Sequence, residues 1–394
     1  MEQPSIDEAL KSHLAWWGLK RFTSDADYFA WQRQQLSSAA LNQLNAQVER
    51  KREGDRRDEI AFYDLTAQPQ ILPVLYSQRY EYYGAIGSRV AARLGDAHAI
   101  LDFGCGVGIL TTFYARQYPD KQVVGIDRSS ASIAVARQKA DALGLANVRF
   151  ECLDVETDQL AGSYDLVIAT HALVQTEQDP GIPSRSWRTF ERAHDRDQQA
   201  AFEQRTGIGL RLDRLAAVLM NHGRVIVFEK TRQLARRIPF QRALAARGLQ
   251  LIEQPEPIRY RVVEEVAEDG PLYVMQKGAD LSVDWDESPE PDREVLFDRS
   301  AGQRNSSDRE APLYENHGHS AQCVWERLKD RTVTKETTRQ EPDGRQMHVE
   351  LGTSEDVSYL YCANTFDQRQ VVIVDPPRTA MIETYYQEIA DGIP

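Results

Sequence analysis

In the stretch from AILDFGCGVG to QVVGID, residues 99–127, two apolar runs end near a carboxylate, and three closely spaced glycines follow the first of these carboxylates. Asp102 and Asp127 each end an apolar run, and glycines occupy positions 104, 106 and 108. Glycine permits positive φ angles and removes the Cβ atom where a ligand must touch backbone. A helix that begins after such a turn offers free N–H groups. A carboxylate at a strand end can also accept two hydrogen bonds from ribose hydroxyls, so these residues indicate a site for a ribose-containing ligand.

The glycine-rich turn is a weak signal by itself, and three interpretations compete. A dinucleotide-binding turn favours GxGxxG, but Ile109 occupies the position of the third glycine. A phosphate-binding GxxxxGK[ST] loop is absent from the sequence. The third interpretation is a tight strand–helix turn that binds nothing. The elements that follow must decide among them.

Strand and helix patterns alternate after the turn. A helical pattern follows Asp127, and the next apolar run ends at Asp154. GSYDLVIATHALVQ predicts a strand from Tyr164 to about Thr170. RLDRLAAVLMNHGRVIVFEK predicts a helix and a fifth strand, and a further helix and two closing strands follow. This alternation is typical of a parallel sheet covered by helices, with ligands at the carboxyl ends of the strands.

The order of these motifs resembles the class I S-adenosylmethionine-dependent methyltransferases over residues 80–280. LDFGCGVG is similar to the family's first motif and GID to its acidic second-strand motif. CLDVE and YDLVIATHALVQ match the third and fourth positions more loosely. The resemblance implies an α/β fold with a seven-stranded Rossmann-like methyltransferase sheet, and S-adenosylmethionine as the cofactor.

The resemblance also implies roles for individual residues. Asp102 and the turn would hold the methionine end of the cofactor, Asp127 the ribose hydroxyls, and Asp154 the adenine amino group. The cofactor-binding residues expected on this basis are Asp102, Gly104, Cys105, Gly106, Asp127, Arg128, Asp154, Val155 and Thr170. The sulfonium is cationic and the ligand carries no phosphate, which fits a turn flanked by carboxylates.

The acceptor end of the site is less defined. His171 follows the fourth strand and is the candidate catalytic residue. It could act as a general base whose pKa lies near the working pH. A packing histidine at a strand end is an equal alternative. Tyr83 in QRYEYYG, His171, and Trp187 in a later insert are the candidate substrate-binding residues. Aromatic faces attract cations, so such a tyrosine could reach the sulfonium. No metal site is expected.

The 394 residues divide into four predicted regions. Residues 1–95 form a helical N-terminal extension, and residues 96–283 the methyltransferase domain, with a helical insert at about 176–209. Residues 284–311 are polar and predict a linker. Residues 312–394 predict an α+β domain of about four antiparallel strands with flanking helices, used for dimerisation or to cover the site. We expect the N-terminal helices and the insert to form a lid.

The composition of the chain argues against several classes of binding partner. The net charge of −13 and sequence pI of about 5.2 argue against a nucleic-acid-binding face. The four cysteines form no CxxC pair, which argues against a disulfide framework or a zinc site. No apolar run approaches the roughly 20 residues that span a bilayer, and no signal peptide is evident. The expectation is a cytoplasmic protein with no membrane or nucleic-acid partner, and the C-terminal domain is a candidate surface for a homodimer.

The function expected from the sequence is methyl transfer to an oxygen or nitrogen atom of a small-molecule acceptor. ATHA replaces an NPPY or DPPY motif after the fourth strand, which counts against methylation of the amino groups of adenine or glutamine. A protein methyltransferase that docks its substrate on the C-terminal domain is the second hypothesis. A non-catalytic scaffold that binds the cofactor is the third.

Overall fold

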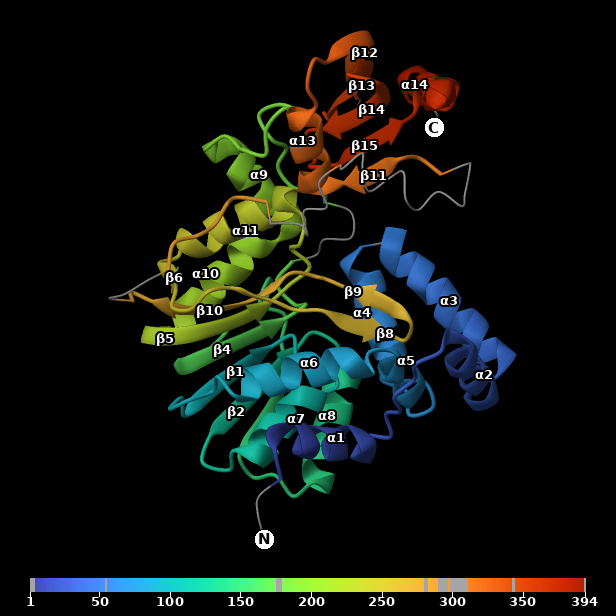
Figure 1. Ribbon diagram of the computed structural model, residues 1–394. Coiled ribbons are helices and arrows are strands. Elements are labelled where there is room, and N and C mark those ends of the chain that lie inside the picture. The colour runs from blue at the N-terminus through green and yellow to red at the C-terminus, as the bar shows by residue number, and fades with distance from the viewer. Residues whose placement is uncertain are drawn as a thin grey trace. The chain divides into compact units, whose positions relative to one another are not determined.

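The computed structural model describes residues 4–53, 55–174, 179–279, 283–289, 297, 311–341 and 344–392 (Figure 1). It divides into two compact units. The sheet unit comprises residues 1–179, 203–232 and 241–285, and the C-terminal unit comprises residues 180–202, 233–240 and 286–394. The division differs from the sequence expectation, because most of the insert groups with the C-terminal residues.

The chain begins with six helices, as the periodicity of residues 1–95 predicts. They are α1 (Ile6–Trp16), α2 (Asp25–Gln35), α3 (Ser38–Glu53), α4 (Arg56–Thr66), α5 (Leu72–Gln78) and α6 (Tyr80–Ala91). Ser5 and Asp55 cap α1 and α4, each in a capping box with the acid three residues later. Helix α6 buries an apolar face against α1 and the central sheet, so α4 to α6 are fixed beside the strand ends.

The central sheet carries the candidate site. Its strands are β1 (Ala99–Phe103), β2 (Gln122–Asp127), β3 (Val148–Cys152), β4 (Tyr164–Thr170), β5 (Leu219–Phe228), β6 (Leu249–Leu251), β7 (Glu256–Pro257) and β10 (Pro271–Lys277). The order is β3-β2-β1-β4-β5-β10-β6, with β7 paired to β10. Strands β1 to β5 are parallel, and β10 is antiparallel to its neighbours. The Rossmann-like methyltransferase sheet predicted from sequence is therefore confirmed.

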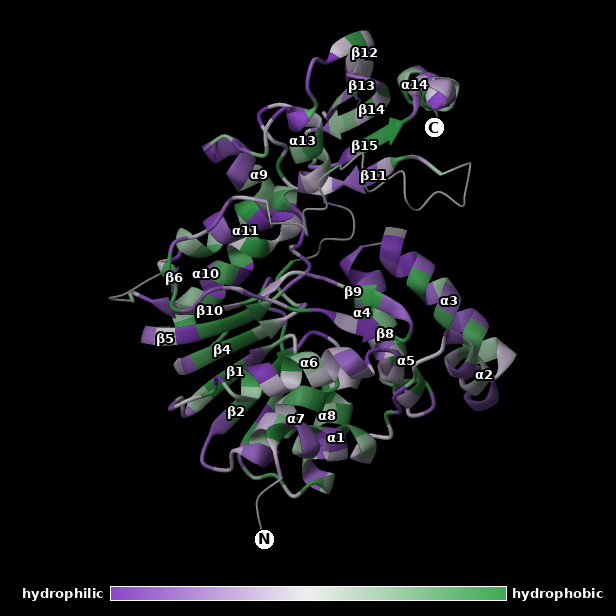
Figure 2. Cartoon of the chain, viewed as in Figure 1, coloured by the Kyte–Doolittle hydropathy of each residue, from purple (hydrophilic) through white to green (hydrophobic). Residues whose placement is uncertain are grey.

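Buried strands need helices on both faces, and the strands are hydrophobic along their length, as Figure 2 shows for β4 and β10. The helices after β1 are α7 (Ile109–Gln117), α8 (Ser130–Ala142), α9 (Arg196–Thr206), α10 (Ile208–Val218) and α11 (Leu234–Ala245). Helices α6, α7 and α8 lie on one face of the sheet, and α10 lies on the other (Figure 1). A short hairpin, β8 (Tyr260–Val262) and β9 (Glu265–Ala267), packs on α6.

The C-terminal unit is an antiparallel α+β domain. Its elements are β11 (Tyr314–His317), α13 (Gly318–Arg327), β12 (Thr332–Gln340), β13 (Gln346–Ser354), β14 (Val357–Asn364), β15 (Arg369–Val374), the 3-10 turn η1 (Pro376–Arg378) and α14 (Thr379–Asp391). The sheet order is β11-β15-β14-β13-β12. Alternate residues of β14 supply two separate cores, one with α13 and one with α14. The four predicted strands are present, and β11 is a fifth.

Residues of the insert pack within the C-terminal unit. The Ser184 N–H donates to the Thr365 carbonyl at 2.7 Å, and Arg192 pairs with Asp367. Trp187 is 6% exposed and stacks flat on His348, with ring centroids 3.6 Å apart. The expectation that the insert covers the acceptor end with Trp187 is therefore corrected for these residues, because their apolar side chains complete another core. Residues 175–178 of the insert lie outside the described residues.

Two composition-based expectations can be compared with the fold. No helix in the described part of the chain combines the length and the apolar character required to cross a bilayer. Cys105, Cys152, Cys323 and Cys362 are all free thiols.

Candidate functional site

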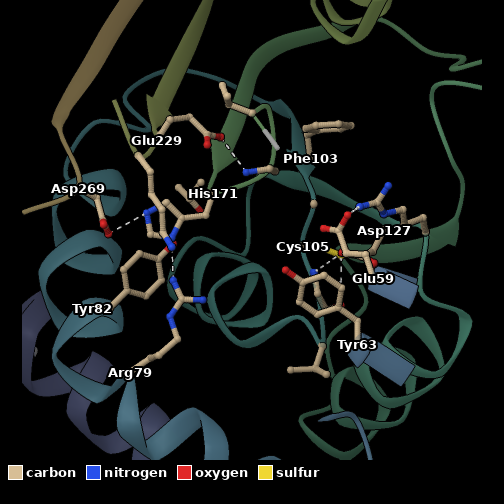
Figure 3. Close-up of a pocket in the computed structure, with 18 of the residues that line it drawn as sticks. Glu59, Tyr63, Arg79, Tyr82, Phe103, Cys105, Asp127, His171, Glu229 and Asp269 are labelled. Carbon is tan, nitrogen blue, oxygen red and sulfur yellow. Dashed lines mark hydrogen bonds and ion pairs between the residues drawn. The ribbon is translucent and has the colours of Figure 1, made fainter. Parts of the chain in front are cut away.

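A cavity of about 830 Å³ opens at the carboxyl ends of the central strands, within the sheet unit. Strands β1, β2 and β4 contribute their last residues, the residues just after β5 contribute as well, and helices α4 and α6 and the β8–β9 hairpin complete the walls. Figure 3 shows two groups of side chains in it, one around Asp127 and Cys105 and the other around His171 and Arg79. Among the candidate residues from sequence, all line this cavity except Trp187.

The glycine turn has the conformation that its sequence predicts. Gly104 adopts φ 71°, and a Cβ atom there would lie 2.3 Å from the Cβ of Ala172. The Gly104 and Cys105 N–H groups both donate to the Ile126 carbonyl, which fixes the turn to β2. Gly106 has φ 54° and open space beyond it, so its backbone faces the cavity. Burial raises the pKa of the Cys105 thiol well above its usual value, so Cys105 is a packing residue rather than a nucleophile.

Asp102 ends β1 inside the cavity and is 5% exposed. The Thr111 hydroxyl donates to its Oδ2 at 2.6 Å, and Oδ1 has no partner among the described residues. Burial raises the pKa of Asp102 to about 7, against the opposing effect of the Thr111 hydrogen bond. A buried carboxylate with one oxygen free favours a cationic ligand group.

Asp127 lies across the turn from Asp102 at the end of β2. Its Oδ2 accepts the Gly106 N–H at 2.9 Å, and its Oδ1 accepts the Ser129 N–H at 2.8 Å. Burial raises its pKa, although these two hydrogen bonds act in the opposite direction. Each carboxylate oxygen can accept a second hydrogen bond, so Asp127 retains the capacity to bind two hydroxyls.

Helix α4 closes the cofactor side of the cavity through ion pairs. Glu59 pairs with Arg128, and Arg56 pairs with Asp154 (Figure 3 labels Glu59). Asp154 also accepts the Glu156 N–H at 3.0 Å, while Val155 is buried beside it. The residues expected along the adenine therefore line the same part of the cavity, and Arg128 and Asp154 form ion pairs with side chains of α4. Sequence reasoning missed these partners, because nothing in the local pattern of α4 pairs it with residues 69 and 98 positions away.

The acceptor end is built around His171. Its backbone has φ 53°, which is unusual for a residue other than glycine, and its N–H donates to the Phe228 carbonyl. Arg79 Nη2 lies 2.7 Å from His171 Nδ1, and Asp269 Oδ2 lies 3.1 Å from Nε2, without good alignment for a hydrogen bond (Figure 3). Burial lowers the pKa of His171 to about 4, so the imidazole is neutral at pH 7.

Tyrosines surround this end of the cavity. The Tyr82 ring stacks on His171 with centroids 5.0 Å apart, and the Arg79 guanidinium lies 4.2 Å from the centre of that ring. Tyr83 packs edge-on against Tyr82, and the Tyr260 hydroxyl donates to Asp269. Burial alone would raise the pKa of Asp269, but the nearby His171 ring and the hydrogen bond from Tyr260 lower it to about 2.

Glu229 follows β5 and holds the loop after β4. Its Oε1 accepts the N–H groups of Ala172 and Leu173, both at 2.7 Å. Burial raises the pKa of Glu229 to about 7. Sequence reasoning missed Arg79, Glu229 and Asp269. The available signals were weak: a basic residue beside an aromatic cluster, and acids next to strand ends.

Comparison with known protein families identifies the domain. A family model described as a methyltransferase domain matches residues 94–257. This range contains the turn, both strand-end acids and His171.

The chain carries a class I S-adenosylmethionine-dependent methyltransferase domain.

Curated relatives match parts of the same region. The chain is 38% identical over 88 residues to trans-aconitate 2-methyltransferase of Deinococcus radiodurans, covering 22% of this chain and 32% of that protein. It is 35% identical over 101 residues to malonyl-[acyl-carrier protein] O-methyltransferase of Acetivibrio thermocellus, covering 24% and 35%. The chain thus spans about a third of the length of these relatives. Among solved structures, the N-methyltransferase NodS of Bradyrhizobium japonicum is 15% identical with a TM-score of 0.33, covering 49% of this chain and 89% of that one.

S-adenosylmethionine is the cofactor of this domain, and the cavity fits its chemistry. The free oxygen of Asp102 suits the ammonium of its amino-acid end, and the open backbone at Gly106 admits close approach. Asp127 can accept the two ribose hydroxyls. The turn has neither the GxGxxG spacing nor the GxxxxGK[ST] pattern that would favour a diphosphate.

Proposed function

We propose that this chain transfers the methyl group of S-adenosylmethionine to an oxygen or nitrogen atom of a small-molecule acceptor. The single observation that supports this most strongly is that the cofactor acids and the His171 end share one cavity of about 830 Å³. Cavities of roughly 300–1,000 Å³ are typical of sites for small ligands. Two relatives are named for trans-aconitate and malonyl-[acyl-carrier protein], and another for (S)-coclaurine, so both atom types occur among them.

The chain's own residues would act by binding, orientation and exclusion of water. The cofactor supplies a methyl group on a sulfonium, whose carbon an acceptor attacks from the side opposite the sulfur. Asp102 would hold the amino-acid end of the cofactor and Asp127 its ribose, beside the Gly104–Gly108 turn. Tyr82 and Tyr83 would exclude water from the reacting atoms. Alignment of nucleophile, methyl and sulfur accounts for much of the rate in such a transfer.

A protein methyltransferase that uses the C-terminal unit for docking remains the second hypothesis. The two hypotheses differ in where the methyl group is found after the reaction. The experiment is to incubate the full chain with radiolabelled S-adenosylmethionine and a cell extract, then separate dialysable from protein-bound label. Label in the dialysable fraction supports the small-molecule acceptor, and label on protein supports the alternative.

A matched variant and a binding measurement make this experiment decisive. Asp127→Ala should lower label transfer in step with weaker binding of S-adenosylhomocysteine. If wild-type chain binds S-adenosylhomocysteine in calorimetry but transfers no label, the scaffold hypothesis is favoured. If it binds none, the proposed function is wrong.

A further inference from the structure

The Arg79 guanidinium is a charged group at the acceptor end whose chemistry the proposed function does not use. Arg79 lines the cavity from the residue that joins α5 to α6. The one hydrogen bond of its side chain among the described residues goes to His171, and the guanidinium face lies over the Tyr82 ring. No carboxylate among the described residues forms an ion pair with it. A guanidinium has five N–H donors, so several remain to meet a ligand.

The charges around this end favour an anion. Asp269 is the nearest acid, but it contacts His171 and accepts the hydroxyl of Tyr260 rather than Arg79. Lys230 also lines the cavity and lies close enough to act electrostatically on both His171 and Asp269. Glu229 also lines this end, but it accepts backbone N–H groups, so neither acid pairs with the Arg79 guanidinium. A planar guanidinium binds a carboxylate through two parallel hydrogen bonds, which makes it the side chain of choice for that group.

His171 is not placed to accept a proton. Arginine can only donate, so Nδ1 of His171 must be the acceptor in the 2.7 Å contact with Arg79. In a neutral imidazole the proton is then on Nε2, the atom that faces Asp269. Neither ring nitrogen offers a free lone pair to an acceptor. Glu229, the neighbouring acid, is engaged with the backbone N–H groups of residues 172–174.

We propose that the methyl acceptor is a carboxylate, held by Arg79, and that its oxygen is methylated without a protein base. This inference rests on the proposed function and narrows its acceptor. His171 is a positioning residue that orients Arg79 between the stacked Tyr82 ring and the cavity.

The chemistry balances without proton transfer. A lone pair of the ionised carboxylate oxygen forms the new O–C bond to the methyl carbon, and the C–S bond breaks. The bonding pair stays on sulfur, so the positive charge of the sulfonium and the negative charge of the carboxylate are lost together. The products are a neutral methyl ester and S-adenosylhomocysteine. A carboxylic acid is already ionised near pH 7, so this step requires no base, whereas an alcohol would require one.

The first experiment identifies the bond that is formed. The full chain is incubated with radiolabelled S-adenosylmethionine and with hexanoate, benzoate or propane-1,2,3-tricarboxylate, and in parallel with the corresponding amides and alcohols. We expect label only from acids, in a product that releases volatile methanol in mild alkali. A label that resists alkali, transfer to an alcohol or amide, or no transfer to any acid overturns the inference. Calorimetry with S-adenosylhomocysteine shows in each case whether the proposed cofactor function still holds.

The second experiment tests the guanidinium itself on the best acid of that panel. Arg79→Gln should raise the KM for the acid roughly 10- to 150-fold, the scale of a lost charge-assisted hydrogen bond. Binding of S-adenosylhomocysteine should change less than about twofold, which also shows that the fold is intact. Arg89→Gln is the matched control, because Arg89 is on α6 but pairs with Glu256 outside the cavity. An unchanged KM in Arg79→Gln overturns the inference.

The third experiment separates a positioning role of His171 from a catalytic one. Asn tolerates the positive φ of this position, and its oxygen can accept from Arg79. His171→Asn should therefore keep kcat within about tenfold and leave it flat between pH 6 and 9. Loss of a general base would instead lower kcat by about 10²- to 10⁴-fold. A fall of that size would contradict methylation without a base.

Discussion

Asp102 gives the sharpest prediction about the cofactor, because its charge changes close to neutral pH. The pKa of its buried carboxyl is raised to about 7. The sign follows directly: above pH 7 the carboxylate is ionised and can pair with an ammonium, and below pH 7 it is neutral and cannot. The ionised fraction falls from about 0.9 at pH 8 to about 0.01 at pH 5. If only the ionised form binds, affinity falls by about 90-fold, or about 2.7 kcal/mol.

The assay compares two ligands by isothermal titration calorimetry between pH 5 and 8. S-adenosylhomocysteine carries the ammonium, and 5′-methylthioadenosine shares the adenine and ribose but lacks the amino-acid end. We expect the 90-fold loss only for the first ligand, with release of about 0.9 proton per ligand bound at pH 6. Titration of Asp127, whose pKa is also raised by burial, would affect both ligands equally.

Two variants test whether the pH dependence of S-adenosylhomocysteine binding arises from the Asp102 carboxyl. Asp102→Asn should bind S-adenosylhomocysteine weakly and with no slope between pH 5 and 8. Thr111→Val removes the hydroxyl that donates to Asp102 at 2.6 Å, so the pKa should rise and the midpoint should move to higher pH. The same slope for both ligands, or a slope that survives in Asp102→Asn, would refute the assignment of Asp102 to the ammonium.

Three further predictions concern the same end of the cavity. Asp127→Ala should weaken binding of S-adenosylhomocysteine in calorimetry by roughly 1.5–3 kcal/mol, since hydrogen bonds to a charged group are lost. Glu59→Gln breaks the ion pair between α4 and Arg128 and should speed ligand dissociation in stopped-flow fluorescence by up to about fivefold, because such partly exposed pairs contribute at most about 1 kcal/mol. Gly104→Ala should lower the free energy of unfolding by more than about 1–2 kcal/mol in denaturant melts, because the strain of the left-handed φ adds to the clash with Ala172. A second substitution in the same chain, Ala172→Gly, removes the clash but not the strain, so it should recover only part of this loss.

The cofactor end could be predicted from sequence because its signals are local. Asp102 and Asp127 are 25 residues apart on adjacent parallel strands, and apolar runs locate both strand ends. The glycines between them are required by the turn itself: Gly104 has no room for a Cβ atom. Such features depend on local backbone conformation and on the spacing of apolar residues, and both can be inferred from a single sequence.

The acceptor end could not be predicted, because tertiary packing assembles it from three distant segments. Arg79 precedes α6, His171 follows β4, and Asp269 precedes the antiparallel strand β10. No spacing rule relates these positions, and each has an ordinary surface interpretation in isolation. His171 illustrates the limit: its position was predicted, but the partners that determine its tautomer were not.

The insert shows a different limit of sequence patterns. Trp187 lies in a mixed-charge segment that suits a lid as well as any other surface. Its position in the fold depends on the complementary apolar surface of the C-terminal sheet, where it stacks on His348. Surface complementarity between segments some 160 residues apart leaves no periodic signal in either of them.

The two ends of the cavity differ in how far they can change without loss of the fold. Asp127 accepts the Gly106 N–H, so the acid proposed to bind the ribose also holds the glycine turn in place. Arg79, in contrast, has no ion pair among the described residues; its guanidinium donates to His171 and lies over the Tyr82 ring. Replacement of Arg79 therefore removes little that stabilises the sheet. The acceptor can thus be altered by a few side chains while the cofactor end stays constant, which makes Arg79 the first position to vary in a search for acceptor specificity.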